Sequence, residues 1–112
     1  MERFGFGPED AFTPRDELLE GVTIAPLSAP GAAQAAIFRL APGGRIVRHP
    51  ATVPQVLAVL DGAGLVSGAD GEFRPIKARE AVFWAAGEEH ETVSDHGLTA
   101  LIVEATDLRP RS

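Results

Sequence analysis

Three side chains suited to ligand binding lie in two separate stretches of the chain. His49 and Gln55 belong to the first stretch, between Gly43 and Gly62, and His90 belongs to the second. Imidazole nitrogens bind divalent metals and exchange protons near neutral pH, and an amide oxygen accepts hydrogen bonds or ligates a metal weakly. These residue types indicate a polar pocket, a metal site or both, provided that the fold brings the two stretches together.

Other kinds of catalytic chemistry find little support in the sequence. There are no cysteines, which excludes thiol nucleophiles, thiolate metal sites and disulfides. None of the serines lies in a nucleophile-elbow context. Glu89 and Glu91 flank His90, but the alternation of side chains along a strand points them away from its face, which disfavours a proton relay. His96 lies in a predicted turn and is expected to be solvated.

The sequence pattern predicts that the secondary-structure elements that carry these residues are β-strands. The chain holds 12 Gly and 9 Pro residues, and short apolar runs alternate with turn signals. Many short strands with regular turns are typical of a sandwich or barrel. Asp61-Gly62 and Asp70-Gly71 are predicted hairpin turns, because Gly tolerates the positive φ that such turns require. The expected strands are 21–27, 33–41, 45–49, 55–60, 64–67, 73–76, 81–84, 89–93 and 98–105.

Both stretches resemble the two sequence motifs of small single-domain cupins, over an aligned region from about Phe38 to Glu104. In the second motif Arg79 stands where the family has Gly, and Ala85 stands for its Pro. The resemblance implies an all-β jelly-roll barrel (a double-stranded β-helix) that forms one domain over 1–112. Within it we expect an N-terminal arm at 1–20, the barrel at 21–106 and a frayed tail at 107–112. The matching positions are Gly43, His49, Ala51, Gln55 and Gly62, then Glu80, Ala85, Gly87, His90 and Ser94.

The metal-ligand set of the family is depleted in this chain. Cupins with the full set bind a divalent ion through three imidazoles and one carboxylate. Here His49 and His90 remain, but Ala51 has no donor atom and Gln55 offers only a neutral amide. If a metal is bound, its ligands would be His49, His90 and Gln55, and its affinity would fall well below that of the full set, because no anion balances the dication. The cofactor, if any, would be a weakly bound divalent metal.

The resemblance therefore implies a pocket in the barrel whose polar floor is His49, Gln55 and His90. Trp84 is a candidate ligand-binding residue at the pocket mouth, but a lone Trp in a barrel is more often a core residue, so both positions stay open. We expect the pocket to bind a small polar or carbohydrate-like molecule. Two alternatives stay open: a metal-dependent oxygenase or isomerase with a reduced ligand set, and an interaction protein with a vestigial pocket.

Charge and composition limit the partners. A net charge of −6 repels phosphate backbones and anionic membrane surfaces, so we expect neither nucleic acid nor membrane binding. The N-terminus has no basic start followed by an apolar stretch, so we expect no signal peptide and a cytoplasmic protein. Phe4, Phe6 and Phe12 lie among Gly, Pro and charged residues. They are expected to pack either on the barrel or on a second copy, and cupins often form homodimers.

Overall fold

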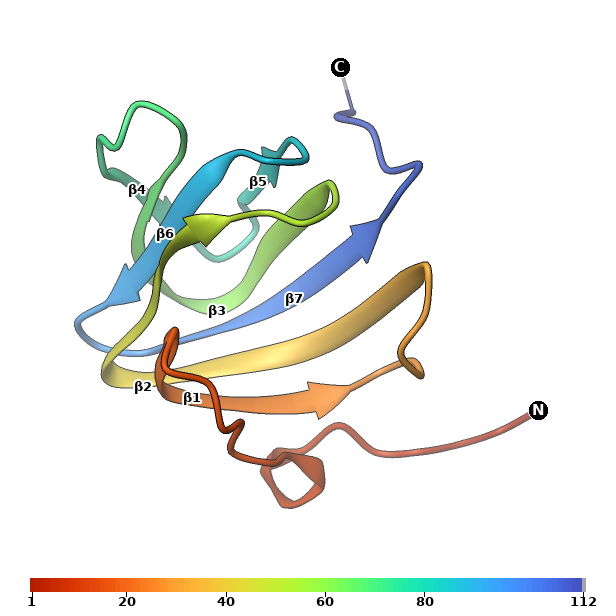
Figure 1. Ribbon diagram of the computed structural model, residues 1–112. Coiled ribbons are helices and arrows are strands. Elements are labelled where there is room, and N and C mark those ends of the chain that lie inside the picture. The colour runs from red at the N-terminus through yellow and green to blue at the C-terminus, as the bar shows by residue number, and fades with distance from the viewer. Residues whose placement is uncertain (112) are drawn as a thin grey trace.

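The computed structural model describes residues 1–111, and its regular secondary structure is almost entirely β-strand (Figure 1), which confirms the predicted all-β fold. Ser112, the last residue of the expected tail, lies outside the described residues. No helix among the described residues is long and apolar enough to cross a membrane. The elements are the 3₁₀-helix η1 (Pro8–Asp10) and the strands β1 (Leu19–Pro26), β2 (Ala33–Pro50), β3 (Gln55–Ser67), β4 (Arg74–Lys77), β5 (Ala81–Trp84), β6 (Glu89–Ser94) and β7 (Leu98–Ala105).

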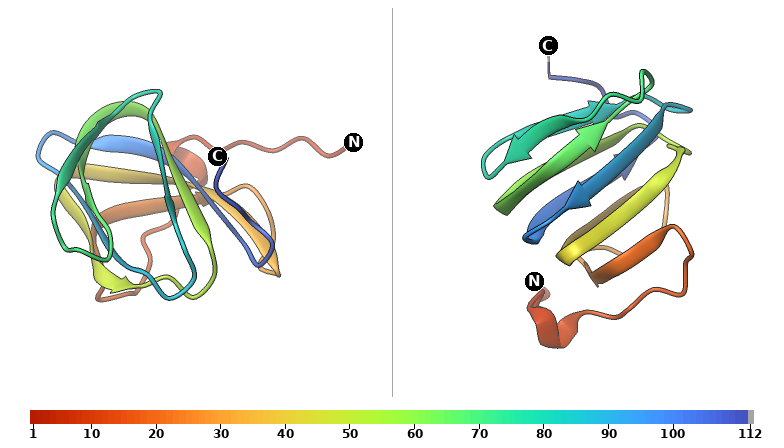
Figure 2. Two further views of the ribbon diagram at one scale, coloured as in Figure 1. Left: turned by 90° about the horizontal axis from the view of Figure 1, so that it is seen from above. Right: turned by 90° about the vertical axis from the view of Figure 1, so that its left-hand side faces the viewer.

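Two long strands, β2 and β3, hold the barrel together because each takes part in both of its walls. The first half of β2 pairs with β1 and β7, and its second half pairs mainly with β6. The first half of β3 pairs with β7 and β5, and its second half pairs with β4 and β6. All pairings are antiparallel, and Figure 2 shows the strands curling around a common interior.

The length of β2 and β3 corrects the sequence-based prediction of separate strands at 33–41, 45–49, 55–60 and 64–67. Asp61 and Gly62 do not form a hairpin turn; they continue β3 and pair with Thr99 and Leu98 of β7. Gly62 has a φ of 81°, and a Cβ there would lie 2.4 Å from the Gly97 carbonyl oxygen, so the glycine permits a close strand crossing. The turn expected at Asp70-Gly71 is confirmed, because it joins the antiparallel strands β3 and β4.

The core lies between the two walls and is built from alternate residues of the strands. In β7, for example, Leu98, Ala100 and Ile102 point inward and are at most 4% exposed. Because side chains alternate along a strand, Glu104 continues this inward row toward one end of the barrel. The buried cluster consists of Val22, Leu40, Ile46, Leu57, Val59, Val66, Ile76, Trp84, Leu98, Ala100 and Ile102.

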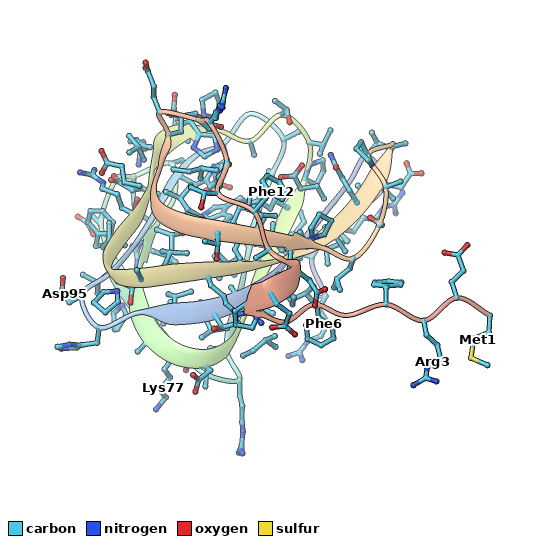
Figure 3. All side chains as sticks on the ribbon, turned by 90° about the horizontal axis from the view of Figure 1, so that it is seen from below. Met1, Arg3, Phe6, Phe12, Lys77 and Asp95 are labelled. Atoms are coloured by element: carbon cyan, nitrogen blue, oxygen red, sulfur yellow. The ribbon has the colours of Figure 1, made fainter. Side chains whose placement is uncertain are left out.

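The N-terminal arm runs along the outer edge of β1. Phe12 exchanges two backbone hydrogen bonds of 2.9 Å with Ile24, which ties the arm to this edge strand. Arg39 donates a hydrogen bond to the Phe6 carbonyl from the neighbouring strand. Phe4 and Phe6 nevertheless remain 62% and 50% exposed, and Figure 3 shows Met1 and Arg3 extending away from the barrel.

Candidate functional site

His49 and His90 are direct partners across the β2–β6 ladder, with their ring centroids 4.4 Å apart. A β-bulge makes this pairing possible. Ile46 pairs with Thr92 and His49 with His90, so three steps along β2 match two steps along β6. In a regular strand Ile46 and His49 would face opposite sides, and the extra residue brings both to the interior.

Both imidazoles are held in the same tautomer by backbone carbonyls. The Nδ1 atom of His49 lies 2.7 Å from the Val47 oxygen, and that of His90 lies 3.1 Å from the Glu88 oxygen. A carbonyl oxygen can only accept, so Nδ1 carries the proton in each neutral ring. The lone pair therefore resides on Nε2, where it can accept a hydrogen bond or a proton, or ligate a metal.

The electrostatic surroundings keep His90 neutral near physiological pH. Burial lowers the pKa of His90 below its ordinary value, and the neighbouring His49 lowers it further. The hydrogen bond to the Glu88 carbonyl and the charges of Glu88 and Glu104 act in the opposite direction. Desolvation is the largest of these effects, so His90 presents a lone pair and not a positive charge to the interior.

Gln55 lies on the same interior face and holds a carboxylate that sequence analysis missed. Its Nε2 donates a 2.7 Å hydrogen bond to Oε1 of Glu104, its cross-strand partner on β7. In the sequence, the acids next to His90 are Glu89 and Glu91. A usable signal was present, since Glu104 continues the apolar row of Leu98, Ala100 and Ile102 and is its one charged member.

These side chains surround a cavity of about 160 Å³ at one end of the barrel. It brings together three of the four sequence-predicted site residues, His49, Gln55 and His90. The Thr92 hydroxyl also belongs to it, is buried, and has no hydrogen-bond partner within residues 1–111. The lining consists of Asp16, Leu18, Leu19, Phe38, Ile46, His49, Gln55, His90, Thr92, Ile102 and Glu104.

Trp84, the fourth predicted site residue, does not line this cavity. Its indole belongs to the hydrophobic core, is 1% exposed, and lies against the His90 ring with centroids 4.4 Å apart. Of the two positions that the sequence left open, Trp84 takes the one in the core, which corrects its candidate role at the pocket mouth. Trp84 therefore packs against the His90 ring from the core. It is also the cross-strand partner of Gln55, through the pairing of β5 with β3.

Glu91 and Glu89 lie off the site, as strand alternation predicts. Glu91 forms an ion pair with Arg45 and is only 8% exposed, on the face of β6 opposite His90. Glu89 is exposed. Neither acidic neighbour of His90 lines the cavity, and the acids that do are Glu104 and Asp16.

The side chains present do not fit the metal site of a full-set cupin. Ala51 is buried and contributes only a methyl group where a second histidine would stand. Among the described residues, no group of three or more His, Cys, Asp or Glu side chains could hold a metal ion. The Glu104 carboxylate already accepts a hydrogen bond from the Gln55 amide nitrogen, so one of its oxygens is partly occupied.

Comparison with known proteins supports the fold. No protein-family model and no curated protein matches the chain. Among solved structures, the polyketide cyclase RemF from Streptomyces resistomycificus superposes with a TM-score of 0.83 at 21% identity, covering 98% of this chain and 82% of that one. A cupin-2 domain from Rhodospirillum rubrum superposes with a TM-score of 0.77 at 15% identity, covering 98% and 78% of the two chains. The chain has the cupin fold.

A third cupin-fold neighbour is similar over a shorter span. A predicted oxalate decarboxylase from Thermotoga maritima is 27% identical, covers 73% of this chain and 77% of that one, and has a TM-score of 0.67. The cupin fold that the two motifs imply is thus confirmed. Because one fold supports many activities, this likeness carries the architecture and not the substrate.

The chemical capacity of this site follows from its atoms. Two imidazoles, the carboxyl groups of Glu104 and Asp16, an amide and a hydroxyl line one small cavity, and the rest of its lining is apolar. Such a site can accept hydrogen bonds from a ligand and can accept a proton from an acidic group. A nearby carboxylate would stabilise the resulting imidazolium.

Proposed function

We propose that this cupin binds a small polar molecule in the barrel cavity without a tightly bound metal. The observation that carries the proposal is the convergence of His49, Gln55, His90 and Glu104, from four different strands, on one cavity. Burying polar groups without partners costs about 1–3 kcal/mol each. The buried Thr92 hydroxyl has no partner among the described residues, and a bound ligand would supply one.

Ligand-observed NMR tests this proposal directly. The protein is screened against a panel of polyols, monosaccharides, phenols, alcohols and amines, first as the wild type and then as His49→Leu. We expect saturation transfer to at least one class of compound, and its loss in His49→Leu. His96→Leu is the matched control, because His96 is exposed and does not line the cavity. If nothing binds, or if binding survives in His49→Leu, the cavity is not a ligand site.

A metal-dependent oxygenase or isomerase with a reduced ligand set is the second candidate. The observation in its favour is the pair of Nε2 lone pairs on His49 and His90, which the backbone fixes toward the interior. Elemental analysis of protein purified without chelator or affinity metal separates the two candidates. Near-stoichiometric metal that is lost in His90→Leu would favour the enzyme, and metal-free protein that still binds small molecules would favour the binding module.

We also propose that the protein is a cytoplasmic homodimer. The absence of cysteine supports a reducing compartment, and the exposed Phe4 and Phe6 support burial of the arm against a second copy. Sedimentation equilibrium tests the assembly, with Phe4→Ser/Phe6→Ser expected to shift dimer toward monomer. If the variant and the wild type show the same molar mass of assembly, the arm does not form the contact. The alternative hypothesis of an interaction protein that uses this surface then loses its main support.

A further inference from the structure

A second, apolar chamber adjoins the polar cavity. The two chambers share three lining residues, Phe38, Ile102 and Glu104. The inner chamber of about 160 Å³ is smaller than the roughly 300 Å³ at which typical ligand pockets begin, and the outer chamber adds about 350 Å³. A ligand that used only the polar residues would leave the larger, neighbouring chamber empty.

The outer chamber is walled mainly by hydrophobic side chains. Its polar members are few: Ser28 already accepts a hydrogen bond from the Ala35 amide, which leaves Gln34 and Glu104. The N-terminal arm contributes one wall, because its pairing with β1 places Phe12, which is labelled in Figure 3, beside Ile24 in the lining. The apolar lining consists of Phe12, Ile24, Pro26, Pro30, Ala35, Ala36, Phe38 and Ile102.

The inner chamber, by contrast, mostly presents acceptors. Nε2 of His49 and of His90 carries a lone pair, because Nδ1 of each ring is engaged by a carbonyl. Gln55 uses its amide nitrogen on Glu104, which leaves its oxygen free to accept. A ligand that complements this set must bring O–H or N–H donors, and the unpartnered Thr92 hydroxyl lies in the same chamber to pair with it.

We infer that the ligand is amphipathic, with a hydroxyl- or amine-bearing head in the inner chamber and a rigid apolar body, about the size of a fused aromatic bicycle, in the outer one. This inference rests on the proposed function, since it names the class of molecule that the same site binds. The head accounts for the acceptors on His49 and His90. The body accounts for Phe12, which is 51% exposed at the chamber mouth although it is aromatic.

Three simple compounds test the two halves of the inference separately. 2-Naphthol has both a donor and a bicyclic body, 2-methoxynaphthalene has the body without the donor, and phenol has the donor with a smaller body. By isothermal titration calorimetry we expect 2-naphthol to bind at least tenfold more tightly than either of the others. Equal affinity for 2-naphthol and 2-methoxynaphthalene would overturn the donor-bearing head, and equal affinity for 2-naphthol and phenol would overturn the apolar body.

Variants in the lining of the outer chamber test whether 2-naphthol binds there. Ala36→Phe fills the outer chamber and should weaken 2-naphthol at least tenfold while leaving phenol bound. Ala33→Phe makes the same change on an exposed part of β2 outside the lining and should leave both unchanged. Phe12→Ala removes a wall without adding bulk, and should weaken 2-naphthol even if Ala36→Phe folds poorly.

The outcomes separate this inference from the proposed function. One outcome is that phenol binds to the wild type and not to His49→Leu, while 2-naphthol binds no more tightly than phenol and its affinity is unchanged in Phe12→Ala. This outcome would support the polar site and would overturn the inference of an amphipathic ligand. If none of the three compounds binds and the wider polar panel also fails, the proposed function itself falls. Binding of 2-naphthol only after removal of residues 1–7 would show that the arm of a second copy occupies the chamber, which also overturns the inference.

Discussion

Gln55 and Glu104 face each other across β3 and β7 and share a 2.7 Å hydrogen bond between amide nitrogen and carboxylate oxygen. Gln55 is 8% exposed, so the bond lies in a partly buried setting where a charged acceptor needs its donor. Hydrogen bonds to charged groups contribute about 1.5–3 kcal/mol, and partial exposure reduces this figure. The pair therefore fixes the carboxylate of the cavity at a definite place.

Breaking this pair should destabilise the protein asymmetrically. Gln55→Leu leaves the Glu104 carboxylate without its donor, and we expect a loss of about 1–2 kcal/mol in the free energy of unfolding. Gln55→Leu/Glu104→Leu removes both partners and should recover most of that loss. Urea denaturation measures both variants against wild type. A double variant that is no more stable than Gln55→Leu would mean that the pair contributes through packing and not through the hydrogen bond.

The sequence predicted the barrel and three residues of the cavity, because motif offsets record strand alternation and turn glycines. His49, Gln55 and His90 were found in this way. Glu104 was not, since it lies 49 residues from Gln55 and no local pattern records which strands become neighbours. The β2–β3 architecture was also missed, because Asp61-Gly62 has the composition of a hairpin turn, whereas the structure uses its positive φ within a continuous strand.

Trp84 shows a further limit of sequence reasoning. Pairing of β5 with β3 and stacking on His90 decide that this indole lies in the core, and both are tertiary relationships. The bulge at Val47 and Arg48 is similar, because it depends on the register with β6. The spacing of a motif assigns His90 to the interior, but it cannot show that Trp84 packs against the His90 ring.

The pH dependence of stability should report the buried His90. Its pKa is lowered from 6.5 in the folded protein, chiefly by burial, so the unfolded chain takes up this proton first as the pH falls. The stabilisation is present above the unfolded pKa and is lost as the pH falls through the folded pKa. We expect the free energy of unfolding to fall as the pH is lowered through and below the ordinary histidine pKa of 6.5, and to fall less steeply in His90→Leu.

His96→Leu is the matched control for this titration, since His96 is exposed in the turn between β6 and β7. It should retain the slope of the wild type. Carboxylates contribute their own losses at lower pH, so the comparison between variants is the informative quantity. Parallel curves for wild type and His90→Leu would show that the protonation of His90 is not coupled to folding.

Arg79 occupies a position where the cupin motif has glycine, and its backbone shows the consequence. Its φ of 76° is the only positive value among the non-glycine residues in 1–111. A side chain in this region costs about 1–2 kcal/mol, while glycine adds about 0.5–1 kcal/mol of entropy to the unfolded chain. Arg79→Gly should therefore stabilise the protein by up to about 1 kcal/mol in thermal or urea unfolding.

A control for the glycine effect is available two residues earlier. Lys77→Gly places the same residue in extended strand β4, where it should destabilise by about 0.5–1 kcal/mol. Opposite signs for the two variants would identify backbone conformation as the cause. If Arg79→Gly is also destabilising, the arginine side chain makes contacts that outweigh its strain.

Restoring the missing ligands should convert the cavity into a metal site if position 51 faces the imidazoles. Ala51→His with Gln55→Glu would give three imidazoles and a carboxylate, which supply the anion and the coordination number that the present set lacks. We expect a strong rise in melting temperature with one divalent ion, against little or no shift in wild type. Ala51→His with Gln55→Leu is the control that adds the imidazole without the anion, and it should respond more weakly. An unchanged metal response in the full variant would show that the methyl group of Ala51 is directed away from His49 and His90, so that the depletion of the motif reflects a reoriented strand end and not only lost ligands.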